Sequence, residues 1–295
     1  MRVLVTGASG HVGGAIAAHL VQCGHDVVGL SRRTSGVAGL CQQIEIDLGA
    51  PAFVEQVIDA TPACDAIIHA AAALDKEPDA PAISLTNCLG TQHILAVAHQ
   101  WNTQSFVYIS GVPVIGMPEI IPIAEDHPVH PLTAYHASKV YGEYLLDVAR
   151  RAGLAGASLR LTSPVGPGMP ANRIFSVFVA RARANQPLQL AGAGTRRQNY
   201  VDVRDVAIAA EQCARERVTG LFNIAGAQSI SNHELAQACV RIIGSSSPIV
   251  FTGQPDREEG IAWEISNARA AERFGYAPRY DVAASIRAVG EDDAA

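Results

Sequence analysis

The chain opens with Val3-Leu4-Val5-Thr6-Gly7-Ala8-Ser9-Gly10-His11-Val12-Gly13-Gly14, an apolar run that leads straight into closely spaced glycines. This order predicts a buried strand, a tight turn and then a helix whose first N–H groups can bind a pyrophosphate. Gly7 allows the turn, Gly10 lets the backbone approach the phosphates, and Gly13 lets the helix pack closely on the strand. The sequence therefore predicts a dinucleotide-binding fold.

The glycines are spaced G-x-x-G-x-x-G, one residue longer than the G-x-G-x-x-G form of such turns. The strand before the turn and the helix after it support the same interpretation despite the longer spacing. The residues of this turn that we expect to contact the cofactor are Gly7, Ser9, Gly10, His11, Val12 and Gly13.

Length and charge limit the classes of protein to which this chain can belong. The chain has 295 residues and a formal net charge of -6. This length allows one large α/β domain or a domain with a smaller lobe. Nucleic-acid binding draws its affinity from clustered Lys and Arg, so the acidic balance argues against a nucleic-acid partner.

The cysteines and the apolar windows indicate where the protein resides. The six cysteines are scattered without a C-x-x-C pair, which predicts buried thiols in a reducing compartment and no metal site. Met1 leads directly into the first predicted strand, so we expect no signal peptide. The most apolar window, residues 106–124, is interrupted by prolines and by Glu119, which excludes an unbroken spanning helix. We therefore expect a cytoplasmic protein without a membrane partner.

Apolar runs and helical stretches alternate through the first half of the chain, as βαβ units require. The predicted strands are Val3–Val5, Val27–Leu30, Ile44–Ile46, Ala66–Ile68, Phe106–Ile109 and Ala157–Leu161. The predicted helices are Gly14–Cys23, Phe53–Ala60, Ile83–Gln100 and Tyr135–Ala152. This order predicts an α/β fold, a Rossmann-type doubly wound parallel sheet with a smaller C-terminal substrate lobe.

Prolines and glycines cluster from Pro164 onward, and after them predicted helices and short strands follow less regularly. We therefore expect a dinucleotide-binding domain over residues 1–165. Residues 166–295 should form mainly a substrate-binding lobe, from which the chain returns to the Rossmann sheet.

A second informative stretch is Tyr135-His136-Ala137-Ser138-Lys139, at the start of a predicted helix. Residues four apart share a helix face, so the Tyr135 phenol and the Lys139 ammonium point into the same space. A nearby cation favours the phenolate form of a tyrosine. The pair therefore predicts a proton-transfer site.

Together these motifs resemble the extended short-chain dehydrogenase/reductase family, in its NAD-dependent epimerase/dehydratase branch, from Met1 to about Ile286. Further stretches carry the resemblance: Asp47-Leu48, His69-Ala70-Ala71-Ala72, Asn87 before a long helix, residues 199–206 and residues 265–270. The resemblance implies that the residues at the cofactor also include Asp47, Leu48, His69, Ala70, Ala71, Asn87, Tyr135, Lys139 and Pro164. It also implies a possible homodimer through the two long helices.

Three departures from the family pattern bear on cofactor and catalysis. Where NAD-using relatives have an acidic residue after the second strand, this chain has Ser31-Arg32-Arg33. Arginine can pair with a 2′-phosphate, so NADP is expected ahead of NAD, which remains possible. The family's third catalytic hydroxyl falls on Gly111, so Ser110, Thr162 or Ser163 would have to supply a hydroxyl. Ser110 is the first choice, although neighbouring strand residues point to opposite sides and Gly111 would have to kink the chain.

The third departure concerns the substrate. The two arginines that hold the diphosphate in nucleotide-sugar relatives align with Gln198 and Gln254. A guanidinium is charged and can donate two parallel hydrogen bonds to a phosphate, whereas an amide is neutral and cannot do the same. A register shift would let Arg196 or Arg197 cover one position and Arg257 the other.

These features predict an NAD(P)-dependent oxidoreductase that transfers hydride between the nicotinamide and a small carbonyl or secondary alcohol. Two alternatives stay open. The first is a nucleotide-sugar epimerase or dehydratase, and the second is a non-catalytic NAD(P)-binding sensor, which the missing hydroxyl at Gly111 would suit.

Overall fold

A computed structural model describes residues 1–74 and 81–292. Within these residues the largest sheet consists of β1 (Arg2–Thr6), β2 (Asp26–Ser31), β3 (Gln42–Glu45), β4 (Ala66–His69), β5 (Ser105–Gly111), β6 (Gly156–Leu161) and β10 (Gly220–Ile224). The strands are parallel and follow the order β10-β6-β5-β4-β1-β2-β3. Their almost continuous burial reflects apolar runs covered on both faces, as in other parallel sheets. The predicted Rossmann-type sheet is confirmed.

Two helical layers cover this sheet. The core on one face joins the sheet to α1 (His11–Gln22) and α6 (Val203–Arg215). The core on the other face joins it to α2 (Phe53–Ala60), α3 (Gly90–Gln100) and α4 (Ala134–Arg151). The predicted helix Ile83–Gln100 is divided, since its first part is the π-helical stretch η1 (Ile83–Leu89) and α3 follows directly. A short 3₁₀ turn, η2 (Val112–Ile115), follows β5.

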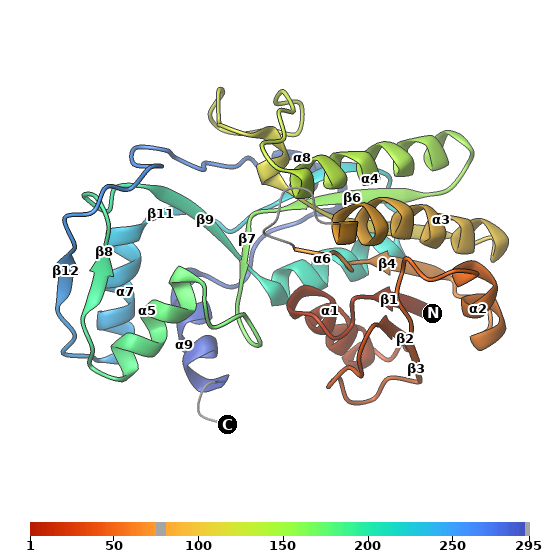
Figure 1. Ribbon diagram of the computed structural model, residues 1–295, viewed down its shortest axis with the longest axis horizontal. Coiled ribbons are helices and arrows are strands. Elements are labelled where there is room, and N and C mark those ends of the chain that lie inside the picture. The colour runs from red at the N-terminus through yellow and green to blue at the C-terminus, as the bar shows by residue number, and fades with distance from the viewer. Residues whose placement is uncertain (75–80, 293–295) are drawn as a thin grey trace.

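The later part of the chain builds a separate lobe with its own core. It contains β7 (Ser163–Val165), α5 (Ile174–Arg183), β8 (Leu188–Leu190), β9 (Arg197–Asp202), β11 (Ser229–Ser231), α7 (Asn232–Ile243), β12 (Ile249–Phe251) and α9 (Val282–Asp292). In contrast, α8 (Ala268–Phe274) packs against β10 in the core of the main sheet. The small sheets β11-β9-β7 and β12-β8 belong to this part of the chain. In Figure 1, β8, β12, α5 and α7 lie at the left, away from β1, β2 and β3.

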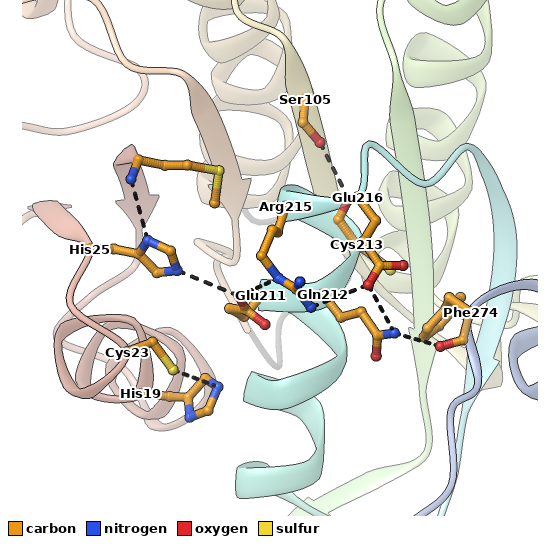
Figure 2. A network of polar contacts seen from close by, with 11 residues as sticks. His19, Cys23, His25, Ser105, Glu211, Gln212, Cys213, Arg215, Glu216 and Phe274 are labelled. Atoms are coloured by element: carbon orange, nitrogen blue, oxygen red, sulfur yellow. Dashed lines mark hydrogen bonds and ion pairs between the residues drawn. The ribbon is translucent and has the colours of Figure 1, made fainter.

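The chain returns from the lobe to the main sheet through α6 and β10. Figure 2 shows the polar joint between this return and the start of the chain. The Glu211 carboxylate of α6 lies 3.5 Å from His25 Nε2 and accepts from Arg215 Nε at 3.0 Å. Gln212 of α6 donates to the Phe274 carbonyl at 2.6 Å. Segments that lie far apart in the sequence are therefore joined on the α1 and α6 face of the main sheet.

No helix among residues 1–74 and 81–292 is long and apolar enough to cross a membrane. No group of three or more His, Cys, Asp or Glu side chains in the same part of the chain is placed to hold a metal ion.

Candidate active site

A cavity of about 780 Å³ lies where the parallel strands end. Its wall comes from the turns after β1, β2, β4, β5 and β6 and from the lobe, the usual place for a ligand of such a sheet. The predicted site residues that line it are Gly7, Ser9, Gly10, His11, Val12, Gly13, Ser31, Arg32, Arg33, Leu48, Ala70, Ala71, Ser110, Gly111, Tyr135, Lys139, Thr162, Ser163, Pro164 and Gln198.

The glycine turn forms one end of this cavity. Gly7 has a φ of 73°, and its N–H donates to the Leu30 carbonyl at 2.7 Å, which ties the turn to β2. A Cβ at Gly13 would lie 2.2 Å from the Gly7 oxygen, so only glycine fits there. The α1 N-terminus has no side-chain cap and no acidic residue in its first turn. Its positive end can therefore receive the pyrophosphate of a dinucleotide, and the residues present fit that cofactor.

Arg32 and Arg33 follow β2 at the same end of the cavity. Both side chains are exposed, and neither has an ion-pair partner within the described residues. Ser31 donates its hydroxyl hydrogen to the Arg33 carbonyl at 2.7 Å and so fixes the backbone here. The nearest acidic position of β3, Glu45, accepts a hydrogen bond from Thr34 at 2.6 Å. Two guanidinium groups are thus available to an anionic group on the cofactor.

Tyr135 and Lys139 lie one turn apart on α4, which begins after Thr133. The Thr133 side chain caps the helix by accepting from the His136 N–H at 3.1 Å. Lys139 is buried, and its Nζ donates to the Ile109 carbonyl at 2.9 Å and lies 5.8 Å from the centre of the Tyr135 ring. The predicted pair therefore meets at the cavity wall.

Burial changes the proton affinity of both groups. Desolvation raises the pKa of Tyr135 to about 12, an effect that the charge of Arg173 opposes. Desolvation also lowers the pKa of Lys139 to about 8, and the Glu143 carboxylate opposes that shift. Without a ligand, the phenol is therefore protonated at neutral pH, and the ammonium is held close to its titration range.

Ser110 faces α4 and is already engaged there. Its hydroxyl donates to Glu143 Oε1 at 2.6 Å, and Arg160 donates to the same carboxylate from Nε at 2.9 Å and from Nη2 at 2.8 Å. The Arg160 side chain is only 3% exposed, so this ion pair is buried. A hydroxyl that gives its single proton to a carboxylate has none to donate to a substrate in this arrangement.

The other candidate hydroxyls differ in their surroundings. Thr162 donates to Asn199 Oδ1 at 3.0 Å, whereas the Ser163 hydroxyl has no hydrogen-bond partner within the described residues. Gly111 has extended backbone angles of φ -147° and ψ 142°. A Cβ at Gly111 would lie 3.5 Å from Pro113 Cδ, an ordinary contact, so the position has room for a side chain.

Asp47 and Gln254, also expected at the site, stand apart from the cavity. Asp47 is exposed, and its carboxylate accepts from the Gly49 N–H at 2.8 Å. Gln254 is exposed as well, and its backbone carbonyl oxygen accepts from the Gly192 N–H at 2.7 Å. Neither side chain lines the cavity.

His69 and Asn87 are buried behind the cavity wall. His69 Nδ1 lies 2.7 Å from the Thr6 hydroxyl, and burial lowers the pKa of His69 to about 3, so the ring is neutral. Asn87 accepts from the Ala73 N–H at 2.7 Å and donates to the Ser138 hydroxyl at 2.9 Å. These contacts place both side chains as supports of the wall.

Glu143 and Arg173 were not among the predicted site residues. Glu143 follows Lys139 by four positions, so the helix period that pairs Tyr135 with Lys139 also brings Glu143 to this face. Arg173 lies on the lobe side of the cavity, directly before α5. No local pattern in the sequence singles it out, since its place depends on how the lobe folds over the sheet.

Comparison with known proteins agrees with this geometry. The model of the NAD dependent epimerase/dehydratase family matches residues 3–225. The UDP-glucose 4-epimerase of Mycolicibacterium smegmatis is 28% identical over 97% of this chain and 96% of its own length. The dTDP-glucose 4,6-dehydratase of Streptomyces antibioticus is 27% identical over 97% of this chain and 90% of its own length.

A solved structure shows the same fold. The UDP-glucose 4-epimerase of Thermotoga maritima, crystallised with UDP-glucose, has a TM-score of 0.88 at 21% identity and covers 100% of this chain and 99% of its own. The relatives are enzymes, which favours the catalytic prediction over a non-catalytic sensor. They also favour the nucleotide-sugar alternative over a small uncharged substrate and do not confirm a preference for NADP. The chain is an enzyme of the extended short-chain dehydrogenase/reductase type and belongs to the NAD-dependent epimerase/dehydratase family.

Proposed function

We propose that this protein is a nucleotide-sugar epimerase or dehydratase that works through a bound nicotinamide dinucleotide. The observation that carries the proposal is the pair of half-buried Tyr135 and buried Lys139, which shares one cavity with a glycine turn able to hold a pyrophosphate. The epimerase and dehydratase relatives, aligned over 97% of this chain, support a substrate of the same class. This replaces the small carbonyl or secondary alcohol expected from the sequence.

In the proposed reaction, each residue of the site has a separate role. The nicotinamide, when bound, accepts and returns the hydride. Tyr135 takes up or returns the proton of the reacting sugar hydroxyl. Lys139 favours the deprotonated phenol through its charge and holds the nicotinamide ribose, as the family resemblance implies. Because Ser110 and Thr162 already donate to Glu143 and Asn199, Ser163 is the hydroxyl at this end of the cavity that would polarise the substrate oxygen.

The experiment is a turnover assay on a panel of UDP- and dTDP-sugars with NAD or NADP, together with Tyr135→Phe. We expect the phenylalanine variant to lose about 10²–10⁴-fold in rate, because it removes the proton-transfer group. Its affinity for the dinucleotide should stay unchanged. Tyr280→Phe is the matched control, since it keeps the ring that lies 3.8 Å from the Arg204 guanidinium and should retain full activity.

Two results would contradict the proposal. A Tyr135→Phe enzyme with most of the wild-type rate would show that another group transfers the proton. A wild-type enzyme that binds the dinucleotide and converts no nucleotide sugar would overturn the substrate class.

A preference for NADP over NAD rests on Arg32 and Arg33 alone and stays a prediction. The double variant Arg32→Ala/Arg33→Ala should weaken NADPH binding by about 10-fold or more, since charged hydrogen bonds to the 2′-phosphate are lost. NADH binding should change little. Titration of both dinucleotides by intrinsic fluorescence measures the difference, and equal losses for both would contradict the 2′-phosphate assignment.

We also propose that the protein forms a homodimer through α3 and α4. The apolar side chains of Tyr141, Tyr144 and Val148 lie on one face of α4 and are 37%, 68% and 65% exposed. Their spacing of three and four residues makes a continuous apolar stripe, which a second copy of the same stripe would cover. A cytoplasmic location likewise stays a prediction.

A further inference from the structure

The charged side chains that line the main cavity are all cationic. They are Arg32, Arg33, Lys139, Arg173 and Arg196. No Asp or Glu from residues 1–74 or 81–292 lines the cavity, although the whole chain has a formal net charge of -6. A cavity of one sign raises the local concentration of ligands of the opposite sign. The cavity is therefore built for anionic groups.

These cations fall into two groups at different parts of the wall. Arg32 and Arg33 follow β2, beside the glycine turn that receives the dinucleotide. Arg173 and Arg196 belong to the lobe and line the cavity together with Tyr135. One dinucleotide over the glycine turn accounts for the first group. The second group calls for an anion on the substrate.

A smaller cavity of about 470 Å³ adjoins the lobe side of the main one. Ile174 and Arg196 line both cavities, so they mark the passage between them. Arg173 immediately precedes Ile174 and so lies beside this passage. A substrate could place its sugar at Tyr135 and a further group in the smaller cavity. The linker between these two parts would then lie beside Arg173.

Arg173 and Arg196 differ in how strongly they are already engaged. Arg196 donates to Glu258 at 2.7 Å and lies 3.5 Å from Asp256. It also faces the Gln198 amide at 3.2 Å when the amide oxygen points toward it. Arg173 is exposed and has no ion-pair partner within the described residues. Arg257 also has no ion-pair partner within the described residues, but it lines only the smaller cavity, so Arg173 is the unneutralised cation on the lobe side of the main cavity.

We propose that Arg173 is the residue that binds the diphosphate of the substrate, at a position where neither Gln198 nor Gln254 supplies a cation. The inference rests on the proposed function and names the specificity residue of that same site. A guanidinium offers two parallel hydrogen bonds to phosphate oxygens, which an amide cannot match. Arg196, held by its two carboxylates, forms the opposite side of the passage. Burial raises the pKa of Tyr135, and the Arg173 charge opposes that rise, so the same group acts on the reacting end of the cavity.

The test compares ligands with and without the diphosphate. Calorimetric titration of the dinucleotide-bound enzyme with UDP, dTDP, uridine and thymidine separates the phosphate contribution from the base contribution. We expect Arg173→Ala to weaken UDP or dTDP binding about 10- to 100-fold, as for the loss of charged hydrogen bonds. Nucleoside binding should change less than 2-fold. Arg173→Lys should recover part of the loss, because it keeps the charge but not the fork.

The matched control is Arg181→Ala, on the same helix. Arg181 donates to the Pro187 carbonyl and lies outside both cavities, so its removal should leave diphosphate binding unchanged. Unchanged NAD affinity and thermal unfolding would show that Arg173→Ala folds correctly.

Two outcomes would overturn the inference, and they are distinguishable. If wild type binds UDP or dTDP and Arg173→Ala binds it equally well, the diphosphate is held elsewhere while the proposed function stands. If wild type binds the dinucleotide and neither nucleoside diphosphate, both the inference and the nucleotide-sugar proposal fail.

Discussion

Gly111 leaves a gap among the hydroxyl groups at the reacting end of the cavity. Ser110 next to it donates to Glu143, and Thr162 donates to Asn199, so both protons are committed. The pairing of Gly111 with Leu161 places Ser163 only two residues beyond the strand position opposite the gap. The proposed reaction would therefore use Ser163 as the donor or have no third hydroxyl.

Gly111→Ser should raise kcat if the donor is missing. The backbone angles are ordinary, and the nearest atom to a new Cβ is Pro113 Cδ at 3.5 Å, so the side chain fits without strain. One such donor supplies ~10²–10³ in rate, and we expect a gain of about 10-fold or more with unchanged cofactor affinity. Gly111→Ala is the control, since it adds the Cβ without the hydroxyl. A serine variant no faster than the alanine variant would show that another group already fills the role.

At the level of single residues, the sequence predicts the cofactor turn and the Tyr135 and Lys139 pair because local spacing determines both. The backbone of the turn and one helix period are enough to place these groups. The sequence does not show which residues line the cavity and which support its wall from behind. His69 and Asn87 belong to matching stretches, yet each is buried behind the wall because its partners, such as Thr6 and Ser138, come from distant elements.

Among the elements, α4 carries the proton-transfer pair and depends on close contact with β5. Gly142 is buried on α4 against the ring of Tyr108. A Cβ at Gly142 would lie 2.3 Å from the Tyr108 hydroxyl oxygen and ring carbon. The glycine therefore sets how closely the helix approaches the strand, and with it the reach of Lys139 to the Ile109 carbonyl.

Gly142→Ala should destabilise the fold by ~1–3 kcal/mol, because overpacking forces α4 away from β5. Urea unfolding followed by circular dichroism measures the change. Gly290→Ala is the matched control: a Cβ there meets only ordinary contacts at 3.8 Å, so its higher helix propensity should add up to ~1 kcal/mol. Equal stability of the Gly142→Ala variant and the wild type would mean that Tyr108 moves aside freely.

The elements of the first half were predictable because their periodicity is strong. Six predicted strands correspond to β1 to β6, with shifts of a few residues at the ends, as for Ile44–Ile46 against Gln42–Glu45. The lobe strands β7, β8, β11 and β12 have only three residues each, too few to show an alternation. Their pairing depends on distant partners, which local propensity does not specify.

For the molecule as a whole, the cavity forms between two parts with separate cores. The sheet and its helices provide the glycine turn and the proton-transfer pair, while the lobe provides Arg173 and Arg196. The joint at α6 and β10, where Glu211 meets His25 and Arg215, fixes the return of the chain to the sheet. If the proposed function holds, the lobe residues Arg173 and Arg196 set substrate specificity, and the residues of the sheet and its helices provide the hydride and proton chemistry.

The apolar stripe on α4 belongs to the scale of the whole molecule, because we propose that a second copy of the chain covers it. Tyr144 and Val148 are 68% and 65% exposed, and burial of such side chains between two copies removes apolar surface from water. The double variant Tyr144→Lys/Val148→Lys should shift the protein from dimer to monomer, because facing copies would place like charges against one another. Light scattering after size-exclusion chromatography measures the mass.

The control for this prediction is Val250→Lys, which changes a 40% exposed apolar residue on β12 of the lobe and should leave the dimer intact. Tyr135 and Lys139 lie on the same helix as the stripe, so dissociation also tests whether a monomer keeps α4 in place. We expect the monomeric variant to retain dinucleotide binding, since the glycine turn lies on β1 and α1. A wild-type protein that is monomeric at micromolar concentration would contradict the proposed interface.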